Sequence, residues 1–105
     1  MRREVWKPGN PLEIKNIRGT AMDNKPSGYR SWIEYFQDYG WNQNTCAVGG
    51  CTNQYQHGAH EYARKREETR TPSKQWIVPL CPSCNHPSRN EWMVTNKKIC
   101  LVSRY

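Results

Sequence analysis

The sequence predicts a single small α+β domain that needs a cross-link to hold it together. The chain has 105 residues, enough for one domain and too few for two with ordinary cores. Only 35% of the residues are hydrophobic, and one Phe accompanies five Trp and six Tyr, so the apolar surface comes in a few large pieces. Short alternating stretches and one short helical stripe supply the expected strands and helix.

Residues 1–30 form an extended N-terminal segment that is rich in turn formers, notably residues 8–11 and 24–28. Residues 4–7 are one extended candidate. Residues 12–17 alternate apolar and polar side chains with the period of a half-buried strand. We therefore predict a short strand over residues 12–17 and assign residues 31–105 to the remainder of one compact domain.

A short helix is predicted to begin after Ser31. This serine has a glutamate three residues on, Glu34, and the two can satisfy each other's backbone donors. The helix should run through Tyr39 and stop at Gly40. One face carries an aromatic stripe of Trp32, Ile33, Phe36 and either Tyr35 or Tyr39. We expect this stripe to belong to the core, with stacking on nucleic-acid bases as the alternative.

Two cysteine pairs have the spacing of zinc ligands: four residues separate Cys46 from Cys51, and two separate Cys81 from Cys84. Four thiolates on two tight turns form a closed tetrahedral set, so the sequence predicts one structural Zn²⁺ per chain. Residues 49–50, both glycine, permit the first turn. An odd total of five cysteines and a start without a signal peptide argue against disulfides, which remain an alternative together with unliganded thiols.

Three further residues bear on this metal site. His57 or His86 could replace one of the cysteines, and Cys100 is expected to be a small buried apolar residue. Between the pairs, residues 52–63 and 74–80 read as a hairpin with an exposed loop over 66–73. After the second pair we predict a short helix over residues 85–92, with Pro87 in its first turn. A terminal hairpin should follow, with residues 93–94 and 99–102 flanking residues 96–98.

The charge distribution points to a polyanionic partner. The net charge is +7, and most of it falls on residues 46–105. A basic metal-stapled domain favours DNA or RNA as the partner. The alternatives are an acidic protein partner, or a charge that only keeps a small protein in solution. No stretch approaches the roughly 20 apolar residues of a membrane span. We expect a cytoplasmic protein with no membrane partner and no small-molecule cofactor.

The cysteine pairs and the segment between them resemble a known family. In the HNH branch of the His-Me finger nucleases, a cysteine pair precedes a strand that ends in Asp-His, and a second strand carrying Asn runs into Leu-Cys-x-x-Cys-His. The corresponding stretches here are residues 58–61 and 76–85. The resemblance covers residues 44–92 and implies a treble clef, made of a knuckle, a β-hairpin, a second knuckle and a short helix. The N-terminal strand and short helix would pack on it. The chain is also similar to small bacterial and phage HNH-like proteins.

The resemblance implies His60 as general base, because it matches the first histidine of the motif. Other family positions differ: Ala59 replaces the metal-binding Asp, Trp76 the orienting Asn, and Asn85 the metal-binding His. Losing the ligands of a catalytic Mg²⁺ should remove several kcal/mol of transition-state stabilisation. The sequence therefore favours a nucleic-acid-binding domain without nuclease activity. An active Mg²⁺-dependent nuclease, with Glu61 as a substitute ligand, and a protein-binding inhibitor or adaptor are the alternatives. His60 could also be an ordinary buried histidine.

If the family's docking surface is kept, cations should contact the phosphate backbone and His60 should face a phosphate. Residues 64–68 could instead be a solvated loop that compensates its own charge. Three aromatic residues, Trp41, Tyr55 and Trp92, could stack on bases but are expected to pack. The predicted nucleic-acid-binding residues are His60, Arg64, Lys65, Arg66, Arg70, Lys74 and Arg89.

Overall fold

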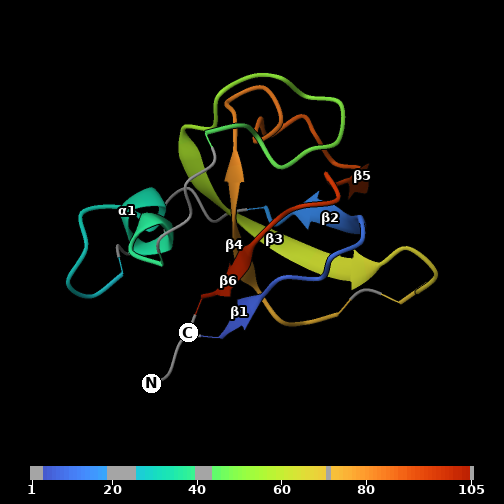
Figure 1. The fold of residues 1–105 in the computed structure, drawn as a ribbon, viewed down its shortest axis with the longest axis horizontal. Helices are drawn as coiled ribbons and strands as arrows, with labels where there is room; N and C mark the ends of the chain where they lie inside the picture. Colours follow the sequence, from blue (N-terminus) through green and yellow to red (C-terminus); the bar gives the residue numbers. More distant parts are fainter. Residues whose placement is uncertain (1–3, 19–25, 40–43, 71, 105) are drawn as a thin grey trace.

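The described residues form one six-stranded sheet with a short helix packed against it. Figure 1 shows the computed structural model, which describes residues 4–18, 26–39, 44–70 and 72–104. The strand order is β1-β6-β4-β3-β2-β5, and every neighbouring pair is antiparallel. The predicted α+β class is confirmed. The elements are β1 (Val5–Trp6), β2 (Leu12–Asn16), α1 (Trp32–Gln37), β3 (His57–Lys65), β4 (Trp76–Leu80), β5 (Met93–Val94) and β6 (Leu101–Ser103).

The hairpin of β3 and β4 lies at the centre of the sheet, as the sequence predicted. His57 pairs with Leu80, and Glu61 pairs with Trp76. The first strand begins at His57, later than the predicted residue 52. β3 is longer than β4, and its second half also pairs with β2, where Asn16 lies opposite Glu61. β3 therefore joins the N-terminal segment to the part of the chain that carries the cysteines.

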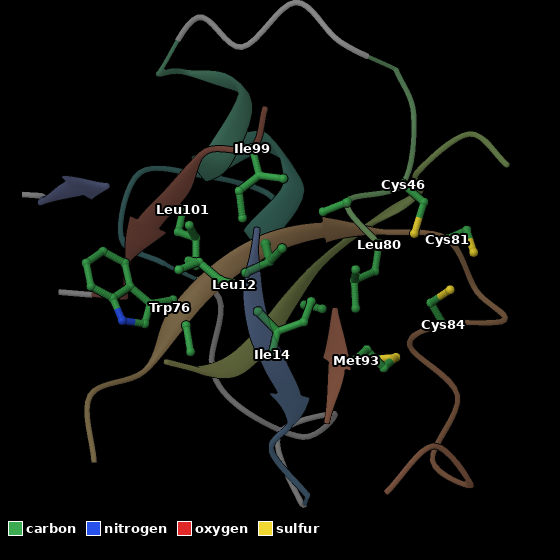
Figure 2. Close-up of a cluster of buried hydrophobic side chains, with 14 residues drawn as sticks. Leu12, Ile14, Cys46, Trp76, Leu80, Cys81, Cys84, Met93, Ile99 and Leu101 are labelled. Carbon is green, nitrogen blue, oxygen red and sulfur yellow. The ribbon is translucent and has the colours of Figure 1, made fainter. Parts of the chain in front are cut away.

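The two faces of the sheet carry separate hydrophobic cores, because successive side chains of a strand point to opposite sides. The first core gathers around β2, β3 and β4 and includes the cysteines near its end. Figure 2 shows Cys46, Cys81 and Cys84 at one end of this core and Trp76 at the other. The second core lies under α1 and consists of Tyr35, Phe36, Ile77, Cys100 and Val102.

Helix α1 begins where the sequence predicted. The Ser31 side chain accepts a hydrogen bond from the Glu34 backbone N–H at 3.2 Å. The Glu34 carboxylate does not return this bond to Ser31. It accepts from the backbone N–H and the Nε of Arg30 instead. The predicted aromatic stripe belongs to the second core, with Tyr35 and Phe36 buried. The helix ends at Gln37, and the predicted stop at residue 40 lies outside the described residues.

The predicted helix over residues 85–92 is wrong, because this segment forms turns. A distant side chain donates to two backbone carbonyls in and next to this segment. Asn16 Nδ2 donates to the carbonyl oxygen of Cys84 at 3.0 Å and to that of Arg89 at 3.2 Å. Pro87 also lacks a backbone N–H to donate. The end of β2 thus shapes the chain that follows the second cysteine pair.

The predicted terminal hairpin is also wrong, because its two strands lie in different parts of the sheet. β5 pairs with β2, whereas β6 lies between β4 and β1. Thr95 fixes β5 in place: its hydroxyl accepts from the Leu12 N–H, and its own N–H donates to the Leu12 carbonyl. β6 is buried along its whole length, which suits an inner strand. Within the described residues, no helix has the length and apolar character needed to cross a membrane.

Candidate metal centre and the adjacent pocket

The four predicted ligands come together in space. The Sγ atoms of Cys46, Cys51, Cys81 and Cys84 all lie within 4.8 Å of one another, and those of Cys51 and Cys81 are 3.8 Å apart. Three of these residues are buried and Cys51 is half-buried. The predicted four-cysteine cluster is therefore confirmed as a group that could bind a metal ion.

The first cysteine pair lies on a loop that two glycines allow. Gly50 has φ +78°, which favours glycine, and a Cβ atom at Gly49 would lie 3.1 Å from the carbonyl oxygens of Val94 and Thr95. The Cys51 N–H closes the turn by donating to the Val48 carbonyl. The two glycines between the cysteines thus let the loop reverse its direction and approach β5.

The second pair lies directly after β4, where a tight turn follows the strand. The Asn85 N–H donates to the Cys81 carbonyl oxygen at 3.0 Å, which places Cys84 inside the turn. The two loops are linked through the sheet, because the Ala47 N–H donates to the Pro79 carbonyl in β4. The local turns orient the thiols, and the β3–β4 hairpin brings the two turns together.

The electrostatics of the cluster favour a bound cation. Burial raises the pKa of the Cys46 and Cys84 thiols well above the ordinary value. Burial acts in the same direction on Cys81, but hydrogen bonds from the Cys84 backbone N–H and from Asn53 Nδ2 outweigh it and lower the pKa of Cys81. Four buried thiolates would repel one another without a counter-charge. A divalent ion supplies that charge, and its binding must release thiol protons.

The other predicted candidates for this centre lie elsewhere. His57 is exposed and lines a separate pocket. The His86 ring is also exposed, and its Nδ1 atom contacts Ser88 Oγ at 2.8 Å and accepts from the Ser88 N–H. Cys100 is fully buried in the second core, as expected of a small apolar residue. The described ligand set therefore consists of four sulfur atoms.

A pocket of about 570 Å³ lies beside this centre, and we call it the His60 pocket. Four stretches of chain line it: the end of β2, the start of α1, the start of β3 and the turns after Cys84. Its ionisable side chains are two arginines, Arg18 and Arg89, and two histidines, His57 and His60. No described carboxylate is among the lining residues. The pocket is thus suited to an anion.

His60 is buried at the wall of this pocket. Its ring meets the Trp32 ring edge-on, with the centroids 4.8 Å apart. Ala59 and Asn85 line the same pocket. Glu61 is fully buried and is absent from the lining, and it points to the opposite face of the sheet from its neighbour His60. The proposed substitute ligand Glu61 is thus separated from His60 by the sheet.

The predicted cationic residues lie in different parts of the structure. Arg89 lines the pocket and pairs with Glu91 at 3.2 Å. Arg64 is mostly buried, pairs with Glu13 at 3.0 Å and lies 3.8 Å from the Trp92 ring centroid, so it supports the fold.

The remaining predicted cations lie away from His60. Lys74 pairs with Glu4 and lies over the Trp76 ring. Lys65, Arg66 and Arg70 are exposed at the loop end of the hairpin. Lys65 is five residues along β3 from His60, a separation of about 17 Å in a strand. The structure therefore does not gather the predicted cations into one surface.

Three polar residues of the pocket were not predicted from the sequence: Asn16, Arg18 and Gln56. Asn16 had a signal, since it continues the apolar side of the alternation in β2 with a polar side chain. Arg18 and Gln56 had none, because only the fold brings them to His60. Of the aromatic candidates, Trp92 and Tyr55 are half-buried, whereas Trp41 lies outside the described residues.

The geometry on its own therefore describes a four-cysteine cluster and a basic pocket beside it. Comparison with protein-family models, with curated proteins and with solved structures finds no match to this chain.

Proposed function

We propose that this protein is a zinc-stapled domain that binds nucleic acid through its phosphate backbone and does not cleave it. The observation that carries the proposal is the His60 pocket, whose described lining holds Arg18, Arg89 and two histidines but no carboxylate. A phosphate group is the commonest polymer-borne anion that such a pocket fits. The net charge of +7 would favour the approach of a polyanion.

Zinc is the ion we propose for the four-cysteine cluster. A tetrahedral Zn²⁺ with Zn–S bonds of about 2.3 Å separates its sulfur ligands by about 3.8 Å. Cys51 and Cys81 have this separation, and the whole set lies within 4.8 Å. Four protein ligands leave no open position for a substrate. The ion would therefore stabilise the fold and take no part in chemistry.

The resemblance to HNH domains also supports the proposal. The order of first cysteine pair, β3–β4 hairpin and second cysteine pair is that of a treble clef. We propose that the chain is a shortened member of this architecture, in which the turns over residues 85–92 take the place of the helix. The His60 pocket would then correspond to the surface with which these domains meet a phosphate.

The same pocket argues against cleavage. A catalytic divalent ion prefers carboxylate and water oxygens. Ala59 offers no ligand, Asn85 offers one neutral oxygen, and Glu61 is fully buried and absent from the lining. His60 could act as a base, but nothing described beside it would hold the ion that stabilises the leaving group.

The test is binding of labelled DNA and RNA of about 20 nucleotides at different salt concentrations. We expect affinity to fall by one to several orders of magnitude between about 50 and 200 mM salt. Arg18→Glu should weaken binding at 50 mM salt by about tenfold or more, because it places a like charge at the pocket. Lys97→Glu makes the same charge change at an exposed residue outside the pocket and should cost no more than about threefold.

Two outcomes would overturn this proposal. The first is no binding to any nucleic acid at low salt, with or without binding to an acidic protein. The second is cleavage of plasmid or RNA in Mg²⁺ or Mn²⁺ that is lost in His60→Ala, which would make the protein a nuclease.

A further inference from the structure

We infer that the His60 pocket accepts a single unpaired nucleotide. This inference rests on the proposed function and narrows it from nucleic acid in general to single strands, ends or flipped-out bases. The pocket has the size of a small-ligand site. A pocket of about 570 Å³ lies within the range of about 300–1,000 Å³ that encloses a small organic ligand. A phosphate on the outside of a duplex needs only a shallow basic surface, so most of this volume would stay unused.

Three residues of the lining carry amide side chains: Asn16, Gln56 and Asn85. An amide offers both a donor and an acceptor, which matches the edge of a nucleobase. A phosphate offers acceptors only, so the amide oxygens would have nothing to bind. The amides therefore favour a ligand that carries N–H groups.

Asn16 is held within the protein, and a ligand can reach only the amides of Gln56 and Asn85. The Nδ2 atom of Asn16 is used within the protein, where it donates to the carbonyl oxygens of Cys84 and Arg89. Its Oδ1 atom is buried and accepts no hydrogen bond from any described residue. Gln56 is exposed and Asn85 is half-buried, so their donors and acceptors can pair with the edge of a base. Base pairing occupies the Watson–Crick donors of a duplex, and only an unpaired base can offer them.

The apolar residues of the lining agree with a base as occupant. Trp32, Ile33 and Pro87 contribute surface that a phosphate does not need and that a flat base ring would cover. Arg18 is exposed at the same pocket and would meet the phosphate of the bound nucleotide. Glu61, which follows His60 in the sequence, is fully buried and is not among the lining residues.

The experiment compares a 12-nucleotide single strand with the blunt duplex of the same sequence at 50 mM salt. We expect the single strand to bind at least about tenfold more tightly, since unpaired bases add contacts that a duplex lacks. The double variant Gln56→Ala with Asn85→Ala should weaken single-strand binding by about tenfold and duplex binding by less than about twofold. Asn90→Ala removes an exposed amide outside the pocket and should change neither.

Competition with small ligands completes the test. A nucleoside monophosphate should displace the single strand, and inorganic phosphate at the same concentration should not. Equal affinity for both strands forms, or equal displacement by inorganic phosphate, would contradict the unpaired-nucleotide inference while leaving backbone binding intact. Absence of binding to both forms would instead overturn the proposed function, and the inference with it.

Discussion

Glu61 carries the one fully buried carboxyl group among the described residues. It lies on β3 between Asn16 of β2 and Trp76 of β4, and neither of its oxygens accepts a hydrogen bond from the described part of the chain. Burial raises the pKa of this carboxyl to about 9. The side chain is therefore protonated in the folded protein at neutral pH, although it would ionise in the unfolded chain.

Because of this residue, we expect the free energy of unfolding to fall as the pH rises. Between its ordinary pKa of about 4.3 and the folded value near 9, the folded state binds one more proton than the unfolded state. Stability should fall across that window and level off above it. Between pH 7 and pH 9 the wild type should lose about 2 kcal/mol relative to Glu61→Gln, which cannot ionise.

Urea unfolding at pH 7, 8 and 9 with excess metal measures this difference. Glu67→Gln alters an exposed glutamate and should follow the wild type. Parallel pH profiles for wild type and Glu61→Gln would show that the buried carboxyl does not titrate as described.

At the scale of the elements, the start of α1 lies close against β3 at Gly58. A Cβ atom on Gly58 would lie 2.5 Å from the backbone carbon of Trp32 and 2.7 Å from the backbone nitrogen of Ile33. Only glycine lets the start of the helix rest on the strand at this distance. The same residues form one wall of the His60 pocket, so the contact shapes the pocket as well as the second core.

Gly58→Ala should displace the start of α1 and destabilise the fold by about 1–3 kcal/mol, because backbone atoms must move. The near-ultraviolet circular dichroism of the aromatic cluster around Trp32 should change with it. Gly9→Ala is the control: its φ of +76° makes the substitution unfavourable, but no atom lies within 4 Å of the added Cβ. An unchanged spectrum and stability in Gly58→Ala would refute the close contact.

On the scale of the whole molecule, the described residues form two small cores and one four-cysteine cluster, which a bound metal ion would turn into a cross-link. The first core shares its end with the cysteine cluster, as Figure 2 shows, so loss of the ion should disturb the core itself. The binding energy of a structural zinc, on the order of 10 kcal/mol, is comparable to the whole stability of a small domain.

We expect metal analysis to return one zinc per chain, and chelation or Cys81→Ser to unfold the protein. Cys100→Ala removes a thiol that lies in the second core and should keep the metal. Circular dichroism and zinc content measured on the same samples check both variants. A folded, metal-free Cys81→Ser protein would mean that the cluster does not staple the fold.

Several features were predictable because they depend on neighbours in the chain. The spacing of Cys46, Cys51, Cys81 and Cys84 indicated the cluster, and Ser31 and the alternation over residues 12–17 indicated α1 and β2. The turn at Gly50 follows from the same kind of local rule.

By itself, then, the sequence determined the strand at residues 12–16, the start of α1 and the four cysteines that could hold a metal ion, since period and turn chemistry act within a few positions. Only the tertiary structure decided which strands are partners. The tertiary structure decided that Asn16 donates to the turns after Cys84 and that Arg64 packs on Trp92. It also decided that Arg18, Gln56 and Asn85 meet around His60. These contacts join positions far apart in the chain, and no local pattern encodes which of many distant groups will satisfy a given donor, acceptor or charge.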